Sequence, residues 1–521
     1  MRKQPQFRPA TCISHIYLND KVYYNMVLSK RKIICLVFAL FCFSSLLLVA
    51  GCSKKEQSDI NHYVMNLSYN EQQHLLFGEE QIKYFNNSEN AFNELHFHLY
   101  PNAFQEGAKN KVVASSKKSE AYSNGESYGF IDIESVTFER GEKASYSVGG
   151  EDENILIVQL QEELFPDECV EINISFKVQI ANINHRLGYG DNTVNFGNFY
   201  PIACVYEDGK GFSESLYHSN GDPFYSDCSN YDVTISYNSN FSLASTGDIV
   251  DEKNSGGEKQ TVLQAKNVRD FCFVLSEKFE KISQKIGETT VNYYGYNGDE
   301  DFENNLNIAS AALGEFNKLF GIYPYKQLSI VKANFIHGGM EFPNIVLISD
   351  TVSKEDFAYV IVHEIAHQWW YGVVGNDQYN HAWQDEALAE YSTLLFYKNH
   401  PQYGEDYRTM IENATKSYKL FVKVYQKVNG SVDGKMDKPL CEFETEPEYV
   451  ECTYTKGVMM MDSIRESIGE KRLLKALQNY YNNFKYKNAF AEDFIAAFVK
   501  VGGSDMESFI RSWLNDRIVF K

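Results

Sequence analysis

The sequence predicts an α+β multidomain protein in which an N-terminal antiparallel β domain, residues 61–283, precedes a mainly α-helical domain, residues 284–521. Three observations lead to this prediction. The first domain contains runs in which apolar and polar side chains alternate, the period of a half-buried strand. Near residue 300 the period changes to three and four residues, which is typical of an amphipathic helix. The 521 residues are too many for one core, and a hydrophobic content of 44% is enough for several.

The first residues of the chain resemble an export signal. Lys30, Arg31 and Lys32 precede an uncharged, mostly apolar run of 18 residues from Ile33 to Ala50, and Gly51 and Cys52 follow it. A basic cluster, an apolar run and small residues before a cysteine are typical of a bacterial lipoprotein signal. A membrane-spanning helix is the alternative, because a run of this length is just long enough to cross a bilayer.

The signal sets the predicted boundaries and the predicted location. Residues 1–51 form the signal, with Met26 as the expected true start, and residues 52–60 form a short tether. Cys52 becomes the lipidated first residue of the mature chain. We therefore expect an extracytoplasmic protein on the outer face of the bacterial cytoplasmic membrane, with the membrane as a partner through the lipid anchor.

The charge of the mature chain excludes a nucleic-acid partner. The formal net charge is −21, but residues 1–51 carry seven Lys and Arg residues and only one acid, Asp20. The rest of the chain keeps 42 basic and 69 acidic residues, a net charge of −27. Such a surface repels nucleic acid, and no basic stripe with interleaved aromatic residues offsets it. The sequence carries no signal for an oligomeric state.

Six cysteines follow Cys52, and their spacing matches no metal site. Cys441 and Cys452 could pair in an oxidising compartment, and buried free thiols are an equal prospect. No functional prediction depends on them.

Alternating runs predict the strands of the first domain. From Val170 to Ile180 every even position is apolar and every odd position between them is polar, which indicates a half-buried strand. Weaker alternation marks Leu95–Leu99 and Ile155–Leu160, and turn clusters such as Asn86–Ser88 and Ser219–Pro223 lie between or after them. Such strands favour a large antiparallel sheet.

The second domain begins with a predicted helix. Its apolar residues recur at three and four positions, and Gly321 is a plausible C-terminal stop. These apolar residues are Leu306, Ala309, Leu313, Phe316 and Phe320. A short apolar strand from Leu328 to Val331 follows, and the remainder reads as mostly helical.

A metal-binding pattern lies on the next predicted helix. A capping-box-like start at Ser353 leads into a run from Lys354 to Tyr371 without Gly or Pro. His363 and His367 are four residues apart, so both imidazoles emerge from one helix face and can bind one zinc ion. Glu364 lies beside them as the candidate general base. An ordinary helix that carries two histidines is the alternative.

Glu386 is the predicted third ligand. A catalytic zinc ion needs three protein ligands and an open position for water. Glu386 follows His367 after eighteen residues, inside a helical segment from Trp383 to Tyr391. We therefore predict one Zn²⁺ per chain, held by His363, His367 and Glu386. Glu390 lies four residues later on the same helix face and is predicted to orient a ligand histidine.

The combined pattern resembles that of the gluzincin zinc aminopeptidases, the family of aminopeptidase N and leukotriene hydrolase. In that family a Gly-x-Met-Glu-Asn strand precedes the zinc helix, and its Glu binds the free amine of the substrate. Gly338-Gly339-Met340-Glu341-Phe342 occupies this place. The resemblance thus assigns amine binding to Glu341 and substrate binding to Gly338, Gly339 and Met340, while Phe342 replaces the family Asn.

The resemblance extends over most of residues 61–521. Tyr454-Thr455-Lys456-Gly457 is similar to the family's Tyr-x-Lys-Gly segment, which makes Tyr454 a catalytic donor to the oxyanion. Gly221–Ser226, Arg269–Phe271 and Phe484–Phe494 are similar to the family's β domain, domain junction and last catalytic helices. The resemblance implies a thermolysin-like catalytic domain, and we expect the C-terminal domains of larger members to be missing.

The implied function is that of a zinc-dependent aminopeptidase, a metallopeptidase that acts on extracytoplasmic peptides with a free N-terminus. Glu364 takes the proton of zinc-activated water, and Tyr454 stabilises the oxyanion. Two alternatives remain. In a zinc endopeptidase Glu341 would be an incidental acid, and in a peptide-binding lipoprotein the fold would persist without the reaction.

Overall fold

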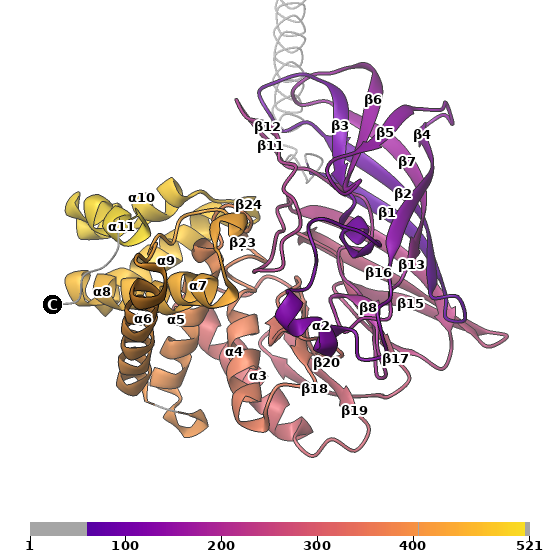
Figure 1. Cartoon of the computed structure of the whole chain (residues 1–521). Coiled ribbons are helices and arrows are strands. Elements are labelled where there is room, and N and C mark those ends of the chain that lie inside the picture. Colours follow the sequence, from indigo (N-terminus) through magenta and orange to yellow (C-terminus); the bar gives the residue numbers. More distant parts are fainter. Residues whose placement is uncertain (1–59, 405, 516–521) are drawn as a thin grey trace, which may run out of the picture. The chain divides into compact units, whose positions relative to one another are not determined.

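A seven-stranded sheet forms the largest layer of the strand-rich part of the molecule in the computed structural model (Figure 1). The structure describes residues 60–404 and 406–515, so the predicted signal and Cys52 lie outside the described residues. The order of the strands is β15-β16-β13-β1-β2-β7-β4. Their bounds are β1 (His62–Asn70), β2 (Leu75–Phe85), β4 (Phe130–Phe138), β7 (Cys169–Gln179), β13 (Ser229–Asn238), β15 (Asp248–Ser255) and β16 (Glu258–Val268).

The predicted antiparallel β domain is confirmed, with one exception in its pairing. Every neighbouring pair of this sheet is antiparallel except β1 and β13, which run parallel. The run from Val170 to Ile180 forms β7, and its apolar side chains from Ile172 to Val178 are buried. These side chains belong to one hydrophobic core, which also receives Phe342 from the second part of the chain.

Smaller sheets complete the strand-rich part. One has the order β10-β3-β6-β5, a second β14-β17-β9-β8, and β11 and β12 form a hairpin. The predicted strand at 155–160 lies within β6, and the one at 95–99 lies in β3 except for Leu99, which follows the end of that strand. The bounds are β3 (Phe92–His98), β5 (Ser145–Gly149), β6 (Ile155–Leu164), β8 (Leu187–Tyr189), β9 (Val194–Phe196), β10 (Ile202–Ala203), β11 (Tyr206–Glu207), β12 (Gly211–Phe212), β14 (Ser242–Ser245) and β17 (Phe273–Ser276); α2 is Lys118–Ala121.

The second part joins a five-stranded sheet to helices (Figure 1). The sheet has the order β18-β19-β20-β22-β21, and β23 pairs with β24. The predicted domain boundary at residue 283 falls within β18 and stays a prediction. The strands are β18 (Phe279–Ile286), β19 (Thr289–Tyr296), β20 (Gln327–Ala333), β21 (Gly339–Met340), β22 (Ile345–Ser349), β23 (Val374–Gly375) and β24 (Lys487–Asn488).

The helices of this part are α3 (Phe302–Leu319), α4 (Lys354–Ala366), α5 (Trp383–Asn399), α6 (Tyr407–Asn429), α7 (Glu446–Val450), α8 (Lys456–Ile468), α9 (Glu470–Phe484), α10 (Ala491–Gly502) and α11 (Asp505–Asn515), with a π-helical turn η5 (Glu451–Thr455) before α8. The predicted first helix and strand correspond to α3 and β20. Among the described residues no helix is long and apolar enough to cross a membrane. Cys441 and Cys452 are both free thiols.

A buried arginine ties the two parts together. Arg269 follows β16, and its Nε donates to Tyr371 O at 2.8 Å. Its Nη1 donates to Ser226 O and to the Asn488 side chain, so one guanidinium joins the strand-rich part to two segments of the helix-rich part. Gly375 lies directly against this guanidinium, and a Cβ there would overlap it.

Glu80 in the core of the strand-rich part leads to a prediction about stability. It lies on β2, only 1% exposed, and neither carboxylate oxygen has a hydrogen-bond partner among the described residues. Burial raises its pKa well above the usual value, so the folded protein holds a proton that the unfolded chain releases at neutral pH. This contribution to stability is complete below the unfolded pKa and is lost as pH rises toward the folded pKa.

We expect Glu80→Met to increase the free energy of unfolding at pH 7.5 by about 1–3 kcal/mol, because it removes an unsatisfied buried acid and keeps the volume. The gain should shrink near pH 4, because Glu80 is then largely protonated in the unfolded chain as well and folding requires little further proton uptake. Urea unfolding followed by circular dichroism at both pH values measures this. Glu79→Gln, at the exposed neighbour, is the matched control and should change little. A destabilised Glu80→Met protein would contradict the prediction.

Candidate metal centre

Helix α4 presents two imidazoles on one face. Ser353 caps the helix by accepting a hydrogen bond from the backbone N–H of Asp356 at 3.1 Å, as the sequence predicts. The helix ends at Ala366, although the run without Gly or Pro extends to Tyr371. His367 occupies the C-cap with helical backbone angles, φ −60° and ψ −18°. The four-residue spacing of His363 and His367 therefore retains its helical geometry.

Three donor atoms converge beside this helix end. His363 Nε2 and His367 Nε2 are 3.1 Å apart, and Glu386 Oε2 lies 3.3 Å from the first and 3.2 Å from the second. Tetrahedral zinc with ligands at about 2.0–2.1 Å places its donors about 3.3 Å apart. The observed spacing matches the edges of that tetrahedron. The residues present thus fit one zinc ion, as predicted from the sequence.

The second nitrogen of each imidazole is held in place. His367 Nδ1 lies 3.0 Å from Trp370 O, which only accepts, so the proton is on Nδ1 and Nε2 presents its lone pair to the metal position. His363 Nδ1 lies 2.8 Å from Glu390 Oε2, although the N–H is not aligned as a hydrogen bond requires. The structure therefore places Glu390 within reach of a ligand histidine, where the sequence predicts it.

Helix α5 is buried on nearly every side, and this burial fixes the position of Glu386. Between Trp383 and Tyr397 every residue except Glu390 is buried. Polar side chains in such a helix need partners, and they have them: Gln384 Nε2 donates to Tyr480 OH at 2.7 Å. A helix held on all sides leaves Glu386 little freedom to move away from the histidines.

Electrostatics couple the three donors. Burial opposes the charge on His363, but its contacts with Glu386 and Glu390 outweigh burial and raise its pKa to about 10. Burial likewise opposes the charge on Glu386, yet His367 and His363 hold its pKa far below the usual value. Zinc binding to this ion-paired cluster would release protons.

Glu364 has the properties of a general base. Its Oε2 is buried and has no hydrogen-bond partner within the described part of the chain. Burial raises its pKa to about 7, against the opposing effect of His363. Gly339 lies against this carboxylate, and a Cβ there would overlap it. Glycine at 339 thus leaves room for a carboxylate that is able to accept a proton.

The predicted amine-binding residue lies just behind the metal donors. Glu341 is 3% exposed, and its Oε1 accepts a hydrogen bond from Gln378 Nε2 at 2.8 Å. Burial raises its pKa well above the usual value, and Asp222 adds to this effect. A carboxylate in this environment gains from a cationic partner.

The other residues of the Gly338–Phe342 segment divide into two groups. Gly338 and Gly339 line the cleft beside the metal donors. Met340 and Phe342 are fully buried in the strand-rich core and do not line the cleft, so a role of the Met340 side chain in substrate binding stays a prediction. Phe342 packs against Gly197, where any Cβ would overlap its ring.

Tyr454 lies over the imidazole of His363. It belongs to η5, and the two rings stack with centroids 5.8 Å apart. Single π-helical turns often occur at functional sites. Gly457 at the start of α8 lies against Ala387 of α5, and a Cβ there would overlap that residue. The Tyr-x-Lys-Gly segment thus brings the Tyr454 hydroxyl to the metal centre through close helix packing.

A cleft of about 370 Å³ opens beside these groups, and it contains residues that sequence reasoning missed. Arg186 and Asp222 form a buried ion pair in its wall. Lys117 contacts Glu446 at 3.0 Å across the cleft. These four residues lie in loops and short helical turns, where no hydrophobic periodicity indicates their position. The only sequence signal was the place of Asp222 in the Gly221–Ser226 segment.

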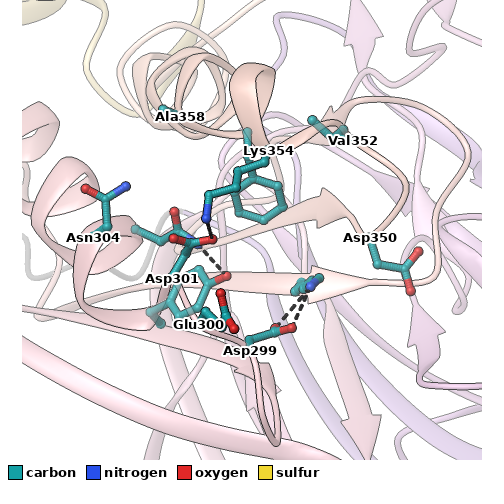
Figure 2. Close-up of a pocket in the computed structure, with 12 residues that line it drawn as sticks. Asp299, Glu300, Asp301, Asn304, Asp350, Val352, Lys354 and Ala358 are labelled. Carbon is teal, nitrogen blue, oxygen red and sulfur yellow. Dashed lines mark hydrogen bonds and ion pairs between the residues drawn. The ribbon is translucent and has the colours of Figure 1, made fainter. Parts of the chain in front are cut away.

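A separate pocket of about 180 Å³ lies at the N-terminal end of α4 (Figure 2). Lys354 reaches Asp301 at 2.9 Å, and Lys332 reaches Asp299 at 2.9 Å. None of the described residues that line this pocket has a buried polar atom without a hydrogen-bond partner, unlike Glu364.

Comparison with known proteins gives a family match for the second part of the chain. Residues 304–513 match the model described as "Peptidase family M1 domain". Aminopeptidase M1-A of Oryza sativa subsp. japonica is 25% identical over 221 residues, which cover 40% of this chain and 24% of that protein. Aminopeptidase 2, mitochondrial, of Saccharomyces cerevisiae is 27% identical over 316 residues, which cover 56% and 30%. The chain thus spans about a quarter to a third of these relatives.

A solved structure shows the same fold over nearly its whole length. The M1 zinc metallopeptidase from Deinococcus radiodurans superposes with a TM-score of 0.63 at 15% identity, covering 89% of this chain and 95% of that one. The likeness confirms the predicted order of a β domain followed by a thermolysin-like helical domain.

Proposed function

Because residues 304–513 form a domain of peptidase family M1, we propose that the protein is a zinc-dependent aminopeptidase, a hydrolase that removes N-terminal residues from peptides. One observation carries the proposal. The donors of His363, His367 and Glu386 converge at tetrahedral spacing beside the unpaired buried oxygen of Glu364. A peptide-binding protein without the reaction would need neither this spacing nor a free base.

The geometry divides the chemistry among these residues. His363, His367 and Glu386 would hold a zinc ion, which would supply Lewis-acid chemistry to the attacking water and the scissile carbonyl. Glu364 accepts the proton of the attacking water and delivers it to the leaving amine. Tyr454 donates a hydrogen bond from its hydroxyl to the developing oxyanion.

Glu341 supports the choice of an aminopeptidase over an endopeptidase. Its buried carboxylate is oriented by Gln378 and lies within the same cluster of groups as His367. An α-ammonium bound there forms a charge-assisted hydrogen bond with the carboxylate. It would also allow only one residue before the scissile bond.

We expect Glu341→Gln to lower kcat/KM on substrates with a free N-terminus by about 30-fold or more, because loss of a buried charge partner costs about 2–5 kcal/mol. Wild type should reject N-acetylated versions of the same peptides. Rates on paired free and blocked peptides, with zinc analysis, measure both effects.

Glu355→Gln, an exposed acid in the first turn of α4, is the matched control and should leave the rates unchanged. Internal cleavage of the blocked peptide at the rate of the free one, unaltered in Glu341→Gln, would favour the endopeptidase.

We further propose, from the sequence of residues 30–52, that the mature protein is lipid-anchored at Cys52 on the outer face of the cytoplasmic membrane. Cys52→Ala should abolish incorporation of labelled fatty acid and leave the chain unprocessed or released. Mass spectrometry of the mature N-terminus checks this. Continued cleavage and labelling of the variant would show that the signal was misread.

A further inference from the structure

The outer face of α6 carries an exposed apolar stripe. Leu420, Val424 and Val428 are 61%, 44% and 76% exposed. They are four residues apart, so they lie in one row along the helix. The face away from the stripe packs onto the protein through Tyr418 and Val422. Contiguous exposed aliphatic side chains of this kind mark a surface that is covered by a partner.

A row of lysines borders this stripe. Lys423 and Lys427 follow Leu420 and Val424 by three residues, and Lys416 precedes Leu420 by four, so each lysine neighbours the stripe on the helix surface. All three lysines are exposed. Lys416 Nζ lies 4.0 Å from Glu412 Oε2, which is a long and therefore weak ion pair. No acidic residue occurs in the sequence from 413 to 432.

This concentration of positive charge contrasts with the rest of the chain. The whole sequence has a net charge of −21, so most of its surface is repelled by an anionic membrane. An interfacial helix shows the opposite combination, an apolar stripe flanked by lysines, which bury their aliphatic stems and extend their amines to the headgroups. The exposed face of α6 has this combination.

We propose that the exposed face of α6 docks on the surface of an anionic lipid bilayer. Leu420, Val424 and Val428 enter the boundary between headgroups and acyl chains, and Lys416, Lys423 and Lys427 contact lipid phosphates. A second copy of the chain in antiparallel orientation fits this face poorly, because such two-fold pairing through α6 would bring the two lysine rows together. The proposal is independent of the peptidase activity.

Docking through α6 would bring the catalytic cleft close to the bilayer. Helix α6 packs directly against η5 and α8. Ser417 of α6 donates a hydrogen bond to Glu451 of η5, the turn that carries Tyr454. The contact therefore sets the orientation of the cleft relative to the bilayer.

Hydrogen exchange of the full chain on vesicles tests this proposal. The lipid proposed at Cys52 is expected to hold the mature chain on vesicles of any composition, so only the contact of α6 differs between lipid mixtures. A lysine near an anionic surface favours the bound state about fivefold. We expect amide exchange in residues 413–430 to slow about fivefold or more on phosphatidylglycerol-containing vesicles relative to pure phosphatidylcholine.

Charge reversal identifies the contact. The triple variant Lys416→Glu, Lys423→Glu and Lys427→Glu should lose the slowing. The matched triple variant Lys471→Glu, Lys475→Glu and Lys500→Glu, which makes the same change in charge at exposed positions elsewhere, should keep it. Replacing Leu420, Val424 and Val428 by Ser should also remove the slowing, with unchanged circular dichroism.

Three results would overturn the proposal. The first is exchange that is equal on the two kinds of vesicle. The second is slowing that survives the reversal of Lys416, Lys423 and Lys427. The third is slowing that follows the protein-to-lipid ratio rather than lipid charge, which would identify α6 as a contact between copies of the chain.

Discussion

Glu364→Gln should lower kcat for hydrolysis of an aminoacyl substrate by about 10²–10⁴-fold, the usual contribution of a positioned general base. The amide has the shape of the carboxylate and fits the same space beside Gly339, but it accepts no proton at neutral pH. Zinc content should stay at one ion per chain, because Glu364 is not among the three converging donors. Steady-state kinetics and elemental analysis measure the two quantities separately.

The control for this experiment is again Glu355→Gln, which alters an exposed acid on the same helix. Full zinc content together with near-wild-type kcat in Glu364→Gln would remove Glu364 from the reaction. Loss of zinc together with loss of rate would instead show that Glu364 is needed to hold the metal.

Glu386→Gln should weaken zinc binding by at least about 100-fold, the upper end of what even indirect ligand partners contribute. A neutral amide oxygen is a poorer ligand, and the buried histidines also lose the negative charge that holds them together. Activity should fall in parallel and recover partly in excess zinc. A competitive chelator titration gives the affinity, and circular dichroism checks that the strand-rich part stays folded.

The matched control is Glu466→Gln on α8, an exposed acid remote from the donors. Unchanged zinc affinity in Glu386→Gln would show that the convergence of Glu386 with His363 and His367 is an ion pair without a metal-binding role.

Local periodicity and short spacing explain what could be predicted from the sequence. The alternation of Val170–Ile180 requires a strand with one buried face, and β7 has that face. His363 and His367 lie at the end of α4, and Glu386 lies on the buried helix α5. Their spacing in the sequence was therefore enough to predict that they converge. Glu390 follows from the same helical repeat.

Features that depend on tertiary contacts could not be predicted. The end of α4 at Ala366 has no Gly or Pro signal; Trp369 and Trp370 are fully buried just beyond it, which redirects the chain. The parallel pairing of β1 with β13 joins segments about 170 residues apart in the chain. Arg186 forms an ion pair with Asp222 only because two loops meet in the cleft wall. A propensity scale contains none of this information.

The arginine that joins the two parts has a consequence for the order of events during synthesis. Two acceptors of Arg269 lie 102 and 219 residues later in the chain, at Tyr371 and Asn488. A nascent chain whose strand-rich part has emerged must therefore either leave this guanidinium in water or bury it with too few partners, which is costly. N-terminal domains usually fold first on the ribosome. Here the junction closes only after Asn488 has been delivered, so a chain truncated before Lys487 should remain open and sensitive to proteases at this junction.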